Sequence, residues 1–117
     1  MTPRSAIVSA LATVPGITAK PTVTGPVSPG DAWPAWRSTR WANLAADGPV
    51  LGAWYVFVAL STGGADVTVM EADPLVDVVA RALMGAGLHV VTVEPYQVTV
   101  AEGGIGIPVL RYTVDDE

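Results

Sequence analysis

The stretch Ala53-Trp54-Tyr55-Val56-Phe57-Val58-Ala59-Leu60 decides the fold that this sequence predicts. It is apolar throughout and rich in β-branched and aromatic side chains, which favour strands over helices. A continuous apolar run of this length, bounded by turn-forming residues, is typical of a strand that is buried on both faces. Asp-Gly-Pro at residues 47–49 and Ser-Thr-Gly-Gly at residues 61–64 supply those turns. We therefore expect residues 53–60 to form the central strand of a sheet.

Two segments with helical spacing of apolar residues lie before and after this strand. The first covers residues 3–14 and stops at Pro15. The second covers residues 65–87, and its expected apolar stripe is Leu75, Val78, Val79, Ala82 and Leu83. Pro74 leaves two alternatives open for this region, because a proline inside a helix either kinks it or breaks it. In the second case Asp73 would cap a separate short helix.

Further segments have the composition of strands. Residues 17–23 include Pro21, which restricts a strand to a sheet edge because proline cannot donate to the ladder. Residues 36–44 roughly alternate between polar and apolar side chains, which predicts one solvated face. After the second helix, residues 88–100 form a long expected strand that Pro95 interrupts.

The last segment, residues 105–114, separates its side chains onto two sides of an expected strand. Val109, Arg111 and Thr113 fall on one side, and Leu110, Tyr112 and Val114 on the other. The elements predict a single α+β domain over residues 1–117 in the order α-β-β-α-β-β. We expect an antiparallel sheet of about four strands with two helices packed on one face. The expected core, where the central strand meets the second helix, contains Val56, Val58, Leu60, Val79 and Leu83.

The charge content of the chain is low. Charged residues make up 15% of the sequence and the net charge is −5, whereas about 25% is usual for soluble domains. We infer that a partner covers part of the surface. The acidic balance gives nucleic acid no broad basic footprint, and no apolar run is long enough to span a bilayer. We expect a soluble protein with no membrane partner and no sequence-specific nucleic acid partner.

Residue types that commonly carry chemistry form no recognisable site. The chain has no cysteine, which excludes disulfides and thiolate metal sites. His89 is the only histidine, and no second ligand accompanies it in sequence. Asp73 and Asp77 share a helix face as paired carboxylates can, but we interpret them as favourable charge near a helix start on a solvated face. The glycine pairs at residues 63–64 and 103–104 lack a phosphate-binding pattern. We expect no enzyme activity, catalytic residue, metal or cofactor.

A cluster of aromatic and arginine side chains follows an irregular segment. Residues 24–34 are dense in proline and glycine, which predicts a loop, and a loop of this length in a compact domain is usually functional. The interface candidates beside it are Trp33, Trp36, Arg37, Arg40 and Trp41. Aromatic residues and arginine concentrate binding energy at protein interfaces. The alternatives are core packing for one or two tryptophans and a nucleic-acid platform, which the acidic charge disfavours.

The order of several motifs resembles a known family. The motifs are Gly30-Asp-Ala-Trp-Pro34 before a Trp/Arg strand, Trp54-Tyr-Val-Phe-Val58, an Ala/Val helix ending near Gly87, Val91-Thr-Val-Glu-Pro95 and Pro108-Val-Leu-Arg-Tyr-Thr-Val114. Over nearly the whole chain this order is similar to the tail terminator proteins of long-tailed phages, the tail-completion or head-to-tail joining proteins, especially those of actinobacterial hosts. The similarity consists of segment order and short apolar motifs.

The resemblance implies a structural subunit that forms a homo-hexameric ring. In that family the ring sits on the head-proximal end of the tail tube, ends its polymerisation and offers a docking face to the head connector or head-completion protein. It implies a place in the virion neck, assembled in the cytoplasm of the bacterial host, and no catalytic residue. By position, residues 24–34 and 33–41 are the expected contacts. The alternative is a small ligand-binding or regulatory α+β domain with a pocket of convergent polar groups.

Overall fold

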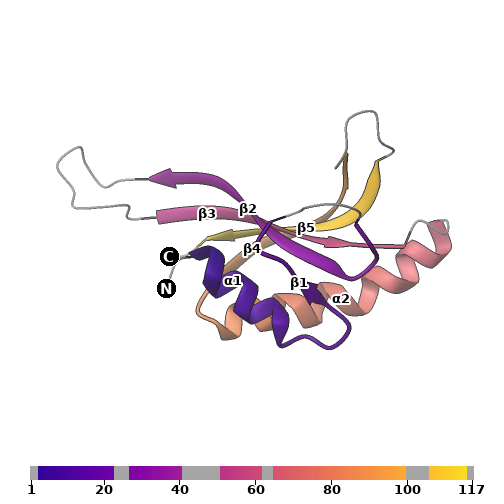
Figure 1. Cartoon of the computed structure of the whole chain (residues 1–117), viewed down its shortest axis with the longest axis horizontal. Coiled ribbons are helices and arrows are strands. Elements are labelled where there is room, and N and C mark those ends of the chain that lie inside the picture. Colours follow the sequence, from indigo (N-terminus) through magenta and orange to yellow (C-terminus); the bar gives the residue numbers. More distant parts are fainter. Residues whose placement is uncertain (1–2, 23–26, 41–50, 62–64, 100–105, 116–117) are drawn as a thin grey trace.

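The computed structural model describes residues 3–22, 27–40, 51–61, 65–99 and 106–115, without the side chains of residues 3, 38–40, 51–52 and 65–69. Over these residues the chain has an α+β fold with two helices and a five-stranded mixed sheet (Figure 1). In chain order the elements are α1 (Pro3–Ala12), β1 (Thr18–Ala19), β2 (Asp31–Arg40), β3 (Leu51–Ala59), α2 (Ala65–Gly85), β4 (His89–Val98) and β5 (Ile107–Asp115).

The sheet has the strand order β1-β2-β3-β5-β4, so β3 is central, as predicted. Its neighbours β2 and β5 are antiparallel to it, and β4 is antiparallel to β5. The expectation of about four antiparallel strands in the order α-β-β-α-β-β is wrong, because β1 adds a fifth, parallel strand at the edge beside β2. The amide of Thr18 donates to the carbonyl of Gly30 at 2.9 Å, and that of Lys20 donates to Ala32 at 2.8 Å.

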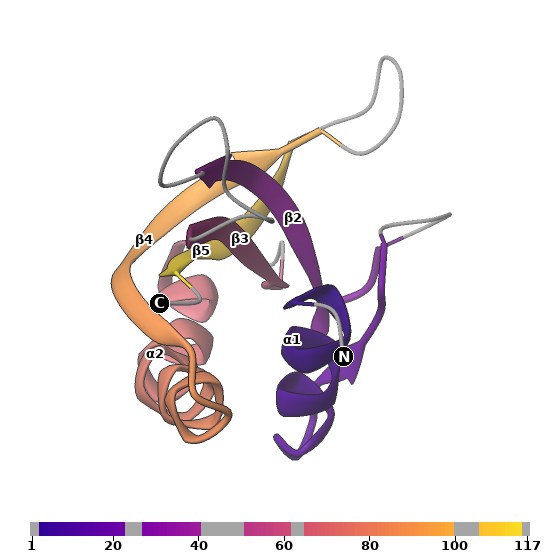
Figure 2. The ribbon, with the colours of Figure 1, turned by 90° about the vertical axis from the view of Figure 1, so that its left-hand side faces the viewer.

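Both helices lie on one face of the sheet, which curves around them (Figure 2). The inner cluster between sheet and helices joins Ile7 and Leu11 of α1 to side chains of β3, α2 and β5. All five predicted core residues are buried: Val56, Val58, Leu60, Val79 and Leu83. Leu110, Tyr112 and Val114 also belong to this cluster, which confirms the predicted division of β5 into two sides.

The opposite face of the sheet carries a smaller outer cluster. Its buried members are Trp33, Phe57, Ala59 and Val109, with half-buried side chains packed around them. Because β3 contributes to the inner and the outer cluster, its uninterrupted apolar sequence is explained by burial on both faces.

β2 begins earlier than the proline and glycine content predicts. Residues 31–34, expected in a loop, are the buried start of this strand. The carbonyl of Pro34 points away from β3 and accepts a hydrogen bond from Arg4 Nη1 at 3.3 Å. The nitrogen of Pro34 therefore lies on the open edge beyond β1, so its missing N–H removes no bond from the β2–β3 ladder. Pro95 likewise lies inside an edge strand, β4, which continues through it.

α2 is one continuous helix that contains Pro74. This resolves the alternative left open by the sequence, and Asp73 lies within the helix rather than capping a second one. The helix ends in a Schellman-type turn, in which Gly87 has φ 88° and the amide of Leu88 donates to the carbonyl of Leu83 at 3.2 Å. Leu83 and Leu88 are both buried in the inner cluster, so the turn is closed by an apolar contact.

Candidate interaction surfaces

The structure divides the predicted Trp/Arg cluster among different environments. Trp33 is a core residue, because it lies opposite Phe57 in the β2–β3 register and packs in the outer cluster with ring centroids 5.7 Å apart. Trp36 is 61% exposed, and Arg37 is also exposed. Arg40 ends β2 opposite Leu51, but its side chain lies outside the described residues, as does the whole of Trp41.

Trp36 and Arg37 point to opposite faces of the sheet. Trp36 is paired with Trp54, which belongs to the inner cluster, and the register shifts at a β-bulge immediately after it. The guanidinium carbon of Arg37 lies 5.5 Å from the ring centroid of Tyr55 on the outer face. Neighbours in sequence therefore contribute to two separate surfaces.

A group of aromatic and charged side chains lies on the outer face beside the outer cluster. We call it the outer-face stack, and it consists of Arg37, Tyr55, Glu94, Tyr96 and Arg111. The guanidinium carbon of Arg111 lies 4.8 Å from the Tyr55 ring centroid and 4.1 Å from that of Tyr96. Such cation–π contacts are worth about 0.5–1 kcal/mol at exposed sites. The stack thus presents ordered rings and guanidinium groups to solvent.

Ion pairing fixes the centre of this stack. Arg111 Nε donates to Glu94 Oε1 at 3.1 Å, and Arg111 Nη2 donates to the same oxygen. The hydrogen bonds and charge of Glu94 raise the pKa of Arg111 above its ordinary value. The members come from β2, β3, β4 and β5, so only strand pairing brings them together. The one sequence feature that indicated a member of this stack was the predicted alternation along β5, which places Arg111 on one side of the strand.

A second surface lies on the side of α2 that faces away from the sheet. We call it the α2 stripe, and it consists of Met70, Asp73, Asp77, Val78, Arg81 and Met84, all of them exposed. Met70 is 77% exposed, Met84 50% and Val78 45%. The expected apolar stripe of α2 is therefore not covered at Val78: Val79 faces the sheet, and the helical turn of 3.6 residues carries its neighbour about 100° away.

α2 carries most of the large hydrophobic side chains that are exposed in the described part of the chain. Of the seven large hydrophobic side chains that are exposed in this part of the chain, α2 carries Met70, Val76, Val78 and Met84. An ion pair lies among them, with Arg81 Nε 2.9 Å from Asp77 Oδ2. α2 is therefore apolar on its buried side and partly apolar on its exposed side.

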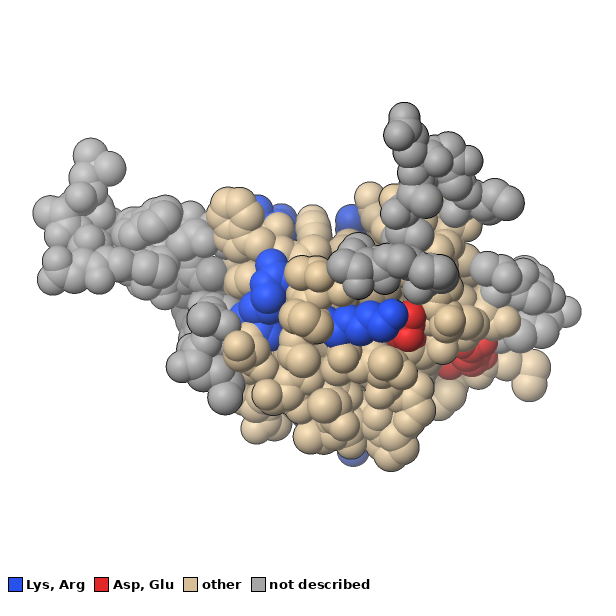
Figure 3. All heavy atoms as spheres, in the orientation of Figure 1, with Lys and Arg blue, Asp and Glu red and all other residues tan. Residues whose placement is uncertain are grey.

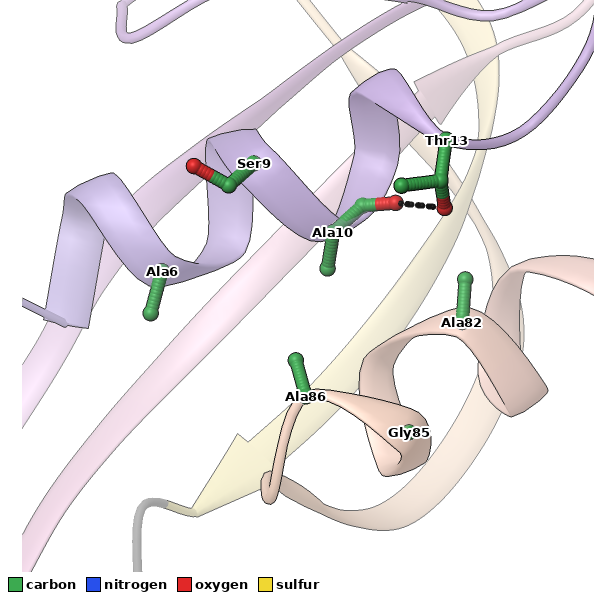
Figure 4. A pocket seen from close by; sticks show the side chains of 7 residues that line it. All are labelled: Ala6, Ser9, Ala10, Thr13, Ala82, Gly85 and Ala86. Atoms are coloured by element: carbon green, nitrogen blue, oxygen red, sulfur yellow. Dashed lines mark hydrogen bonds between the residues drawn. The ribbon is translucent and has the colours of Figure 1, made fainter.

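A groove between α1 and α2 bears on the ligand-binding alternative (Figure 4). Its lining consists of small residues, namely Ala6, Ser9, Ala10, Thr13, Ala82, Gly85 and Ala86. Thr13 Oγ1 already donates to the carbonyl of Ala10 at 2.7 Å. Because metabolite sites orient their ligands with several convergent polar groups, this lining does not favour a metabolite.

The residues considered for chemistry are dispersed over the surface. Asp73 and Asp77 are exposed in the middle of α2, so the expectation that they lie near a helix start is wrong. His89 is exposed at the start of β4. Within the described residues, no group of three or more His, Cys, Asp and Glu side chains could hold a metal, and no helix is long and apolar enough to cross a membrane. Both glycine pairs lie outside these residues.

The described part of the Pro/Gly segment is anchored to the fold. Asp31 is buried, and its Oδ2 accepts hydrogen bonds from the amide of Ser28 at 2.9 Å and from Lys20 Nζ at 3.0 Å. The Ser28 bond, and then Lys20, lower the pKa of the Asp31 carboxyl against the opposing effect of burial. A side chain at Gly30, where φ is 93°, would place its Cβ 2.7 Å from the carbonyl oxygen of Gly16. This segment therefore contributes packing as well as surface.

Comparison of the chain with protein-family models, with curated proteins and with solved structures finds no match. Support for a function therefore comes from the two surfaces, from the low charge and from the motif order described above.

Proposed function

We propose that this chain is a structural subunit of a long-tailed phage that forms a homo-hexameric ring on the head-proximal end of the tail tube. The ring ends tail polymerisation and joins the tail to the head. Its partners are other copies of the chain, the tail tube protein and the head connector or head-completion protein. It belongs to the virion neck and assembles in the cytoplasm of the bacterial host. The motif order that resembles tail terminator proteins supports this proposal.

The apolar side chains Met70, Val78 and Met84 on the exposed side of α2 are the observation that carries the proposal furthest. A helix that is apolar on more than one side is typical of a helix that is covered on more than one side. The sheet covers the side of Val79 and Leu83, whereas Met70 and Met84 face solvent. Monomeric soluble proteins rarely keep large apolar patches uncovered. A subunit that is buried in an assembly explains this distribution.

The low charge of the visible surface also agrees with a subunit that binds other proteins. On the face shown in Figure 3, uncharged side chains cover most of the described surface, and the basic and acidic ones are few. Interface cores are depleted in charge and enriched in aromatic residues, methionine and arginine. Trp36, Tyr96 and Met84 are exposed residues of these types.

A ring is the form of cap that the tail geometry requires. A tube that copies itself at its growing end stops only when the next subunit presents a different outer surface. The cap must match the rotational symmetry of the tube, and a closed ring satisfies the interface of every subunit equally. In this role the chain needs no catalytic residue, metal or cofactor, and its recognition of partners depends on shape and surface chemistry.

The proposal is tested by a charge placed at the C-terminal end of the exposed, partly apolar side of α2. We expect Met84→Asp to leave the monomer folded and to give phage lysates with unjoined heads and tails of irregular, excessive length. The matched control Met84→Leu keeps apolar bulk and should give normal virions. Circular dichroism of the purified variants checks the fold. Normal virions from a phage that carries Met84→Asp would contradict the proposal.

A further inference from the structure

The outer-face stack and the α2 stripe lie on opposite sides of the molecule. α2 packs under the concave face of the sheet (Figure 2). Its residues Val79 and Leu83 face the sheet, so the exposed residues of the stripe point away from it. The stack covers the convex face, because Tyr55 and Arg111 project opposite to the inner-cluster residues of β3 and β5. One subunit therefore carries two different exposed surfaces that cannot touch each other.

The two surfaces have opposite charge balances. The stack contains two guanidinium groups and one carboxylate, whereas the stripe contains two carboxylates and one guanidinium. Arg37 in the stack is exposed, and Asp73 in the stripe is also exposed. Oppositely charged surfaces guide two copies into a fixed orientation and disfavour contact between like surfaces.

The uncharged side chains of the two surfaces are also complementary. The stripe offers the thioethers of Met70 and Met84, and the stack offers the rings of Tyr55 and Tyr96, of which Tyr96 is 44% exposed. A methionine sulfur near an aromatic ring contributes about 0.3–1.5 kcal/mol. Burial of the methionine and tyrosine side chains would supply the affinity, while the exposed charges set the orientation.

We propose that the outer-face stack of one subunit docks onto the α2 stripe of a second copy of this chain. The contact is head-to-tail, so each added copy leaves one free stack and one free stripe. Repetition of such a contact closes a ring when the rotation between neighbouring copies divides a full turn, and gives an open filament otherwise. This is the contact between neighbouring subunits of the proposed ring, so to that extent the inference rests on the proposed function.

The test uses two variants of the full chain that each damage one surface. Met84→Asp places a carboxylate in the stripe, and Arg37→Glu reverses a charge in the stack. Native mass spectrometry of the wild type at increasing concentration should show species larger than a dimer. Each variant alone should remain monomeric, because every contact needs both surfaces. Met84→Leu and Arg37→Lys are the matched controls and should assemble like the wild type.

The mixture of the two damaged variants gives the sharpest result. Each variant retains one intact surface, so an equimolar mixture should form heterodimers and nothing larger. Assembly of Arg37→Glu like the wild type, larger rings from the mixture, or a wild type that stays monomeric or dimeric at every concentration would overturn the proposed contact. Circular dichroism confirms that both variants are folded.

The contact and the phage function can fail separately. If the variants behave as expected in solution but the phage makes normal tails without the protein, the contact stands and the function is wrong. If tail length depends on the protein but Arg37→Glu caps tails like the wild type, the function stands and the contact is wrong.

Discussion

The hydroxyl of Tyr112 in β5 donates a 2.7 Å hydrogen bond to the backbone carbonyl of Leu75 in α2. Tyr112 is fully buried, so this bond links the sheet to the helix inside the inner cluster. The accepting residue, Leu75, directly follows Pro74, which has no backbone N–H. The bond helps to set the rotation of α2, with Val79 facing the sheet and Val78 facing solvent.

Removal of this hydroxyl should weaken the attachment of α2 to the sheet. We expect Tyr112→Phe to lower the free energy of unfolding by about 0.5–1.5 kcal/mol, the usual net value of one hydrogen bond. Denaturant titration at neutral pH measures the change. Equal unfolding free energies for the variant and the wild type would show that the bond contributes nothing.

The same side chain predicts a loss of stability in alkali. Burial raises the pKa of Tyr112 above its ordinary value. The unfolded state therefore releases this proton first, so the stabilisation is complete below pH about 10 and declines as the pH rises further. Tyr112→Phe lacks this contribution, and its unfolding free energy should fall less steeply above pH 10 than that of the wild type. Parallel pH profiles would contradict the assignment.

The two sides of α2 should respond differently to truncation. Leu83→Ala leaves a cavity in the inner cluster and should cost about 2–5 kcal/mol of unfolding free energy. Val78→Ala, on the exposed side, is the control and should change it by less than about 0.5 kcal/mol. Thermal unfolding followed by circular dichroism compares them. A large effect of Val78→Ala in the isolated monomer would mean that the helix is rotated.

The carboxylate of Asp31 should protect the fold at acidic pH. Its pKa is lowered by the hydrogen bond from Ser28 and by Lys20, so its stabilisation is complete above pH about 4 and is lost as the pH falls through the folded-state pKa. Asp31→Asn should be less stable at pH 7 by about 1–3 kcal/mol. Its unfolding free energy should also depend less on pH below 4. Wild-type acid sensitivity in the variant would be inconsistent with this role.

The core was predictable because its signals are local. The apolar run around Val56 and Val58 and the helical spacing of Val79 and Leu83 indicate burial without knowledge of the pairing partners. Val78 was included in the expected apolar stripe although it is exposed, because apolar residues at helical spacing can form a stripe wider than the side of the helix that packs against the sheet. Contacts from another element, including the hydrogen bond of Tyr112, set which part of that stripe is covered.

The surfaces were harder to predict because they depend on pairing between distant segments. The density of proline and glycine predicted a loop up to Pro34, although that residue sits in β2 where its nitrogen faces an open edge. Trp33 and Trp36 are close in sequence, but the strand alternation sends one to the outer cluster and leaves the other exposed on the inner side. The stack around Arg111 exists only through the register of four strands.

The length of phage tails tests the central claim most directly. An early stop codon in the gene for this chain removes the protein from an infecting phage, and electron microscopy of the lysate then gives the distribution of tail lengths. We expect headless tails with a broad distribution that extends beyond the wild-type length, and restoration of a single length when the protein is supplied from a plasmid. Tails of normal, uniform length joined to heads in the absence of the protein would contradict the account.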